Sequence, residues 1–382
     1  MSKKILLFSV DFSGVTNKLF SEFIPLDVVI EEHKIPKIWR LYFFSIITTF
    51  SPNYKKWVVK AERKYNLLQK TPWAFKLKSK WCADVLKKKK LENYASIIQV
   101  SGTFNALAYF KADVCFYILT DYTMELAARK QRQAIRPLIP PNDRLVFDWY
   151  ELETALYQRA HGIAVPSLYI KESLNQFYGV SKTKLHNIGY GNNLILNFEA
   201  KTKELDLNKT IKVLFVGKQF IAKGGNEIVA SIKSLNHAGI KTKLSIVGPR
   251  VNPGVNIPNV TYLGRIYDKE KLVQLYREAD FFMIHSSYEA FGLVLLEAMS
   301  VGVPCIASNV DGMPDILCQT GAGKVVQLGD PDAIVNTVKE YLEEPQTYTV
   351  ASKAGINAVA SYYNWPAVSQ RFYKMVSSDD KQ

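Results

Sequence analysis

Apolar runs and helical patterns alternate along two long stretches of the chain. Continuous apolar runs at 4–10, 96–100 and 114–119, with shorter ones at 163–166 and 185–188, are typical of parallel strands covered on both faces. A second series of such runs lies at 211–216, 244–247, 260–263, 281–284 and 304–307. Between the runs, apolar residues recur with helical spacing. The pattern therefore predicts an α/β protein with two Rossmann-like, doubly wound domains.

Domain boundaries follow from the breaks in this pattern. Residues 196–210 are polar and lack periodicity, which indicates a linker between an N-terminal domain (1–195) and a C-terminal domain (211–360). The tail, 361–382, carries an apolar stripe that predicts a helix packing back on the first domain. Ligands of doubly wound sheets bind at the carboxyl ends of the strands, so we expect the site in a central cleft between the facing domains.

Composition narrows the class of protein. Of the 382 residues, 48% are hydrophobic and 22% charged, which excludes a disordered chain or a coiled coil. The four cysteines form no C-x-x-C motif, which argues against a disulfide framework or a zinc ribbon. The apolar run 38–50 contains Arg40 and is shorter than the ~20 residues of a membrane span. The apolar N-terminal run stops at Asp11 without a cleavage site, so we expect a cytoplasmic protein.

The net charge of +14 comes from one segment. Residues 34–90 hold sixteen Lys or Arg, ending in four consecutive lysines at 87–90, against two acids, Glu62 and Asp84. Eleven aromatic residues are interleaved with them. This mixture suits an anionic membrane surface or an acidic acceptor, and would place the protein peripherally at the inner face of a membrane. A solvated basic face with inward aromatics remains the alternative, and binding of nucleic acid is disfavoured.

A second segment, 286–299, carries candidate chemistry. Glu297 stands in an almost wholly apolar run, where a buried carboxylate is costly unless hydrogen-bonded; the vicinal hydroxyls of a ribose would satisfy both oxygens. Glu289 follows the strand at 281–284 and should face the cleft. The amides of Phe291, Gly292 and Leu293 begin the next helix, where anions are attracted. The alternative is a structural, salt-bridged glutamate and a helix cap.

A loop between the strand at 211–216 and the next helix adds positive charge. It begins at Gly217 and contains Lys218 and Lys223, which can clamp a diphosphate and stabilise it as a leaving group. The P-loop spacing is absent, and a solvated loop is the alternative interpretation.

Together these motifs resemble those of retaining glycosyltransferases with the GT-B fold, family four. Glu289 and Glu297 form the E-x7-E signature within E-A-F-G-L-V-L-L-E-A-M, and G-V-P-C-I-A-S follows. The loop from Gly217 to Gly224 is similar to the family's G-R-x-x-x-x-K-G donor-phosphate loop. The resemblance is dense in the C-terminal half and thin in the N-terminal half.

The resemblance implies a role for each matching residue. Glu297 would bind the ribose, Glu289 would face the transferred sugar, and Lys218 and Lys223 would hold the diphosphate. The backbone of Phe291, Gly292 and Leu293 would contact sugar or phosphate, Arg265 would border the base, and Gly14 would let the N-terminal domain approach the donor. The donor would be a nucleotide sugar, with UDP favoured and GDP-mannose the second choice. The acceptor would be a glycan, a lipid or a small molecule.

No cofactor or metal is expected, because basic residues would neutralise the diphosphate. The one D-x-D, at Asp330, contains Pro331 and is better read as a helix start. Where the family often places a histidine near the acceptor, this chain has Asp121, which would position the acceptor or cap a helix.

Two departures and two alternatives accompany the resemblance. Lys218 stands where the family usually has arginine, so a bidentate fork is lost. Asp315 ends an altered G-G-x-P-E motif, which puts its role in doubt. A sugar-nucleotide epimerase is one alternative, although such enzymes lack the E-x7-E segment. A catalytically inactive GT-B adaptor is the other, and replacement of the glutamates or lysines would favour it.

Overall fold

The chain forms two compact units. The computed structural model describes residues 3–10, 14–23, 27–111, 113–131, 139–140, 142–194, 197–254 and 257–377. Met1–Ile188 with Ser369–Gln382 make up the first unit, and Gly189–Val368 the second. The chain thus changes unit at Gly189 and at Ser369, where the sequence suggested residues 195 and 361. Residue 196, at the start of the expected linker, and Asp11 lie outside the described residues.

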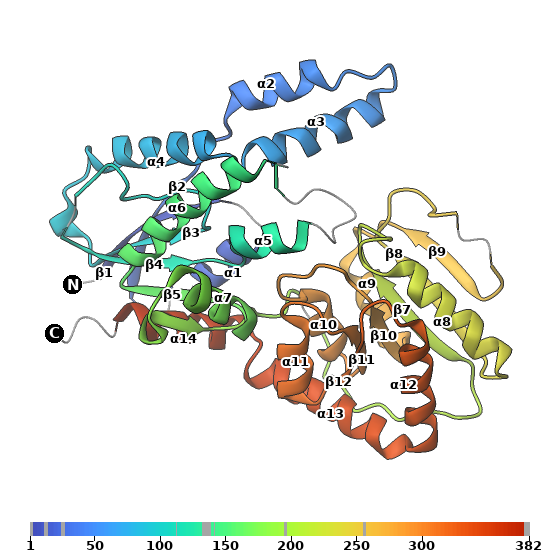
Figure 1. Ribbon diagram of the computed structural model, residues 1–382. Coiled ribbons are helices and arrows are strands. Elements are labelled where there is room, and N and C mark those ends of the chain that lie inside the picture. Colours follow the sequence, from blue (N-terminus) through green and yellow to red (C-terminus); the bar gives the residue numbers. More distant parts are fainter. Residues whose placement is uncertain are drawn as a thin grey trace. The chain divides into compact units, whose positions relative to one another are not determined.

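The first unit contains a six-stranded parallel sheet in the order β2-β1-β3-β4-β5-β6 (Figure 1). Its central strands are apolar on both faces, and Leu6, Ile98 and Ile118 on these strands are fully buried. This pattern is typical of a parallel sheet that helices cover on both sides. The strands are β1 (Lys3–Ser9), β2 (Val28–Lys34), β3 (Ser96–Val100), β4 (Cys115–Leu119), β5 (Gly162–Val165) and β6 (Leu185–Asn187).

Helices connect these strands. Helix α7 (Leu168–Tyr178) shows how local sequence sets the ends of a helix. The Ser167 hydroxyl accepts the amide of Ile170, and Gly179 ends the helix in a left-handed conformation. The other helices of this unit are α1 (Val15–Ser21), α2 (Trp39–Thr48), α3 (Tyr54–Leu68), α4 (Pro72–Leu86), α5 (Met124–Gln131) and α6 (Asp143–Arg159).

The second unit contains another six-stranded parallel sheet, in the order β12-β11-β10-β7-β8-β9 (Figure 1). Its strands are β7 (Ile211–Val216), β8 (Thr242–Val247), β9 (Val260–Gly264), β10 (Phe281–Ile284), β11 (Cys305–Ser308) and β12 (Gly323–Val326). Its helices are α8 (Gly225–His237), α9 (Lys269–Glu278), α10 (Leu293–Met299), α11 (Met313–Thr320), α12 (Pro331–Glu343) and α13 (Pro345–Ser361). Both sheets are doubly wound, which confirms the predicted α/β class.

From Ser369 onward, the last helix, α14 (Trp365–Ser377), belongs to the first unit and buries apolar side chains there. The Phe372 ring packs edge-on against Phe20 of α1, with centroids 5.7 Å apart, and also contacts Phe23. Asn364 caps this helix by accepting the amide of Ala367.

Residues 197–210 form neither helix nor strand. Lys203 holds them to the second unit, because its amide donates to the Ser352 hydroxyl and its ammonium to the carbonyls of Arg277 and Ala279. This segment is therefore fastened along part of its length.

Candidate active site

The carboxyl ends of three strands in the second unit are joined by backbone hydrogen bonds. The Gly217 amide, after β7, donates to Val247 of β8 at 2.9 Å, and the Gly248 amide donates to Gly264 of β9 at 2.8 Å. The loops that carry Lys218 and Arg265 therefore start from one edge of the sheet. This is the edge at which doubly wound sheets bind their ligands.

The lysine loop is also fastened to the end of β10. The amide of His285 donates to the Lys223 carbonyl, and the amide of Ser287 donates to the Ala222 carbonyl, both at 3.1 Å. Gly224 makes this approach possible. It adopts a left-handed φ of 75°, and a Cβ there would lie 2.1 Å from the His285 carbonyl oxygen. The loop and the strand end thus form one rigid corner.

Lys223 and Glu289, predicted to act on different parts of the donor, form an ion pair. The Lys223 ammonium lies 2.6 Å from Glu289 Oε2 and also donates to the Tyr288 carbonyl at 3.0 Å. Both side chains are about one-fifth exposed, at 22% and 19%, so the pair is only partly screened by solvent. The structure therefore presents the two groups as one charged unit.

Asp311 orients the Lys223–Glu289 ion pair, and it was not among the residues predicted from the sequence. Its Oδ2 accepts the amide of Glu289 at 3.0 Å, while its own φ is 53°. An Asp in left-handed backbone is uncommon outside turns, but that conformation is not visible in a sequence. The signal available was the departure of the segment 311–315 from the family motif.

Glu297 is held by a buried tyrosine. On α10, its Oε2 accepts the hydroxyl of Tyr276 at 2.8 Å, and Tyr276, on α9, is fully buried. Burial, and secondarily the Glu297 charge, holds the pKa of Tyr276 well above its ordinary value, so the hydroxyl remains a donor. Glu297 itself is partly exposed. The sequence predicted that a ribose would satisfy both carboxylate oxygens of Glu297, but Tyr276 of the protein already binds one of them. The available signal was a tyrosine on the apolar face of a predicted helix, because a buried tyrosine hydroxyl usually finds a hydrogen-bond partner.

The remaining predicted donor residues lie around this corner in different environments. The ring of Phe291 is buried against Tyr190 and Tyr363, so Phe291, Gly292 and Leu293 can offer mainly backbone groups where α10 begins. Lys218 is exposed. Arg265 is partly buried, and its Nε has no hydrogen-bond partner within the described part of the chain.

His285, at the end of β10, has a structural contact. Its Nε2 accepts the amide of Gly329 at 2.7 Å, and burial lowers the pKa of the ring. Asp330 Oδ1 accepts the amide of Ala333, so the D-x-D motif starts α12 as predicted. In the described ranges no group of three or more His, Cys, Asp or Glu could hold a metal ion.

Gly14 and Asp121 belong to the first unit. Gly14 precedes α1, and a Cβ on it would meet nothing within 4 Å. Asp121 follows β4; burial raises the pKa of its carboxyl, and the positive charge of Lys70 opposes that rise. Helix α5 is capped instead by Thr123, whose hydroxyl accepts the amide of Leu126, so capping does not account for Asp121.

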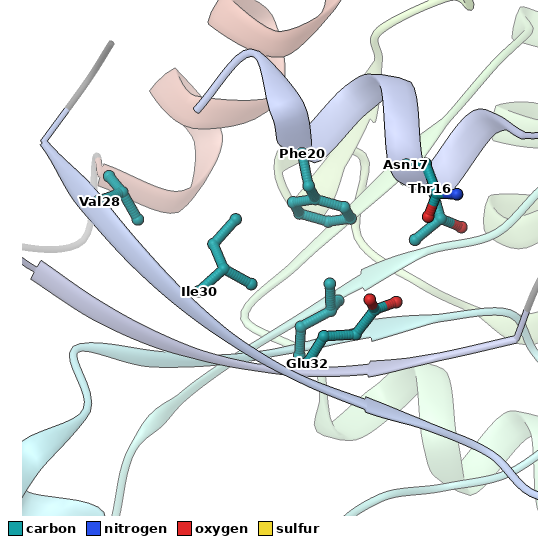
Figure 2. A pocket seen from close by; sticks show the side chains of 7 residues that line it. Thr16, Asn17, Phe20, Val28, Ile30 and Glu32 are labelled. Atoms are coloured by element: carbon teal, nitrogen blue, oxygen red, sulfur yellow. The ribbon is translucent and has the colours of Figure 1, made fainter. Parts of the chain in front are cut away.

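A pocket of about 330 Å³ lies close to Gly14, between α1 and β2 (Figure 2). Phe20, Val28 and Ile30 form its apolar wall, and Thr16 and Glu32 line its polar end. Glu32 also accepts a hydrogen bond from Ser9 at 2.5 Å. None of the predicted site residues lines this pocket.

Sequence comparison identifies the family of the segment that holds the charged corner, which is the lysine loop and the end of β10 with the Lys223–Glu289 ion pair. Residues 197–358 match the family model described as glycosyl transferases group 1. This segment belongs to that family. For these residues, the predicted membership of a glycosyltransferase family is confirmed.

Two curated relatives illustrate the range of the family. The segment is similar to O-antigen chain mannosyltransferase B of Escherichia coli, 39% identical over 106 residues, or 28% of this chain and 27% of that protein. It is also similar to the N-acetyl-alpha-D-glucosaminyl L-malate synthase of Bacillus anthracis, 30% identical over 125 residues, or 32% of each chain. The matched regions thus span about a third or less of these two relatives.

Solved structures resemble the whole chain. Sucrose-phosphate synthase from Thermosynechococcus elongatus superposes with a TM-score of 0.66 at 19% identity over 99% of both chains. Anabaena HepE in complex with UDP-glucose superposes with a TM-score of 0.61 at 14% identity over 98% of this chain and 99% of that one. At these identities the likeness shows the fold, and it confirms the predicted GT-B class. Across the described residues, no helix is both long and apolar enough to cross a membrane.

Proposed function

We propose that the protein is a retaining, metal-independent glycosyltransferase that transfers a sugar from a nucleotide-diphosphate sugar to a hydroxyl group. The observation that carries the proposal is the charged corner of the second unit. There the Lys223–Glu289 pair and the Tyr276-bound Glu297 lie within a segment of the group 1 family. Such a corner offers a cation for a diphosphate and carboxylates for hydroxyl groups.

The donor's parts are assigned to these groups. Glu297 binds the ribose hydroxyls from its partly exposed position, and Arg265 borders the base. Lys218 and Lys223 neutralise the diphosphate, with backbone amides of Gly292 and Leu293 beside it. A UDP-sugar is favoured, which the UDP-glucose complex of HepE supports; a GDP-mannose donor is the second choice, which fits the mannosyltransferase of Escherichia coli.

The reaction follows from this arrangement. The bond between the anomeric carbon and the phosphate oxygen breaks, and the nucleoside diphosphate leaves with the electron pair. The two lysines stabilise the negative charge that develops on the diphosphate and so take the place of a metal ion. The acceptor oxygen bonds to the anomeric carbon on the same face, and its proton passes to the departing phosphate oxygen. Because the acceptor attacks the face from which the diphosphate departs, the configuration is retained. Glu289 stabilises the sugar's transient positive charge.

The acceptor binds to the first unit. Asp121 positions the acceptor hydroxyl, and the backbone at Gly14 borders the donor. We place the protein in the cytoplasm, and the acceptor is a glycan, a lipid or a small molecule.

Nucleotide binding tests the proposal through thermal stability. A ligand at ~100 times its dissociation constant adds ~2.7 kcal/mol to the free energy of unfolding, so UDP- and GDP-sugars should raise the melting temperature measurably. Glu297→Ala removes a charged hydrogen-bond acceptor and should weaken binding about tenfold to a hundredfold.

The matched control is Glu340→Ala, at an exposed glutamate of α12 in the same unit. It should bind as the wild type does. If no sugar nucleotide shifts the melting temperature, or if the two variants behave alike, the donor assignment fails.

A further inference from the structure

Helices α2 and α3 form a hairpin with a narrow core of its own. Figure 1 shows them side by side at the margin of their unit. The Tyr42 and Tyr65 rings meet edge-on at 5.5 Å, the Tyr65 hydroxyl accepts the amide of Ile38, and Ser45 and Ala61 are buried. The inner faces of the two helices thus pack against each other.

The outer face of α2 is apolar and exposed. Trp39, Phe43 and Ile47, spaced four residues apart, form one row and are 60%, 58% and 73% exposed. Other large apolar side chains of the hairpin that are at least half exposed are Phe44, Phe50 and Tyr54. The alternative interpretation, in which the aromatic side chains of this segment pack inward, is therefore wrong for these residues. A continuous exposed apolar strip of this kind marks an interaction surface.

The turn of the hairpin ends in a preformed aromatic cluster. The Trp57 indole N–H donates to the Ile46 carbonyl at 2.9 Å, and its ring contacts Phe50 and Tyr54 with centroids 5.4 and 6.5 Å away. Amphipathic aromatic rings held in this way are enriched where proteins meet the headgroup level of a bilayer.

Positive charge accompanies the apolar strip. Residues 35–70 include eight Lys or Arg and a single acid, Glu62. Arg40 shares a helical face with Phe44 and Ile47, and the Lys64 ammonium lies 4.9 Å from the centroid of the Phe44 ring. An apolar strip alone would suit many partners, but aromatic and basic side chains on one element complement an anionic lipid surface.

We propose that the α2–α3 hairpin docks on an anionic phospholipid bilayer by inserting its aromatic strip at the headgroup level. Docking itself goes beyond the proposed function and does not depend on it, whereas the acceptor class inferred from docking rests on that function. It adds a location to the acceptor: α3 leads into Lys70, which interacts with Asp121, so a docked hairpin brings the predicted acceptor loop toward the membrane. The substrate class that fits is a lipid-linked acceptor.

The lysines at 87–90 contribute less to the attraction for an anionic bilayer than their number suggests. Lys87 pairs with Asp84 at 3.0 Å, and Lys89 with Glu31 on β2. Because local carboxylates compensate these two ammonium groups, they supply a charge control for the hairpin.

Co-sedimentation with vesicles tests the proposal. The probes are vesicles of equal parts phosphatidylcholine and phosphatidylglycerol, and vesicles of phosphatidylcholine alone. The wild type should bind the anionic vesicles, and Phe43→Ser with Ile47→Ser should weaken that binding about tenfold or more, because two large apolar groups no longer enter the bilayer. The matched control is Tyr109→Ser with Phe147→Ser, two exposed aromatics of the same unit, which should bind as the wild type does. Lys87→Glu should also change binding little.

Two further readouts separate docking from other contacts. Brominated lipid should quench the tryptophan fluorescence of the wild type much more than that of Trp39→Phe, because Trp39 enters the bilayer. Nucleotide-induced stabilisation should be equal in all variants, so failure of the donor assignment would be seen separately. Equal vesicle binding by the hairpin and control variants would overturn the proposal. So would a wild type that ignores anionic vesicles but self-associates in sedimentation velocity through Phe43 and Ile47.

Discussion

Glu153 is a carboxylate buried in the first unit beneath the loop that carries Asp121. Its oxygens accept the Tyr157 hydroxyl at 2.9 Å, the Tyr178 hydroxyl and the amide of Met124 at 2.8 Å. Burial outweighs these hydrogen bonds and raises the pKa of Glu153 from 4.5 to about 7. The carboxyl group therefore titrates in the folded protein close to neutral pH.

This shift predicts a pH dependence of stability. The folded state holds the proton more tightly than the unfolded state, so the contribution of Glu153 is fully present below the ordinary pKa of 4.5 and is lost as pH rises to about 7. Over that range the wild type should lose roughly 3 kcal/mol relative to Glu153→Gln, which cannot titrate. Urea unfolding at a series of pH values measures the difference; parallel curves for the two proteins would refute the assignment.

Among the site residues, the charged types were predictable from the sequence, but their contacts were not. Lys223, Glu289 and Glu297 stand in recognisable motifs. The pairing of Lys223 with Glu289 joins positions 66 residues apart, and it arises only when the lysine loop is fastened to β10. Asp311 and Tyr276 also act through long-range contacts, so the local signals at their positions did not reveal that they bind Glu289 and Glu297.

At the scale of elements, the corner between the lysine loop and β10 depends on Gly224. Gly224→Ala should be strongly destabilising, because a methyl group would meet the His285 carbonyl at 2.1 Å in addition to the strain of a left-handed backbone. Gly239→Ala is the matched control, since its φ is 81° but nothing lies within 4 Å of a Cβ.

Thermal unfolding of both variants measures the difference. The control should lose about 1–2 kcal/mol from backbone strain alone, and Gly224→Ala clearly more, with weaker nucleotide binding. Equal losses in the two variants would show that the corner is not tightly packed.

Strands that are buried on both faces were readily predicted. Strands β7 and β10 are covered on both faces and appear as apolar runs, whereas the edge strand β2 carries Glu31 and Glu32 and was missed. Helix α2 was also missed, because both its inner and outer faces are apolar and it shows little amphipathic period. Its exposed apolar face is what a bilayer-docking helix needs, so the failure of the pattern coincides with the proposed interaction surface.

At the scale of the whole molecule, the excess positive charge and the proposed donor site lie in different units. The excess positive charge lies within 34–90 of the first unit, and the lysine–glutamate corner lies in the second. Substitutions in one unit should therefore leave the primary property of the other intact. This separation is why vesicle binding and nucleotide binding can be tested independently.

The central claim is tested most directly by following the donor's sugar during slow hydrolysis. Proton NMR of a UDP-sugar, or of GDP-mannose, with the protein in excess EDTA reports which anomer is released first, and water stands in for the unknown acceptor. We expect release of the nucleoside diphosphate and a sugar with the donor's own anomeric configuration, with chelation making no difference. An inverted anomer, or no turnover of any sugar nucleotide with or without divalent metal, would contradict the account.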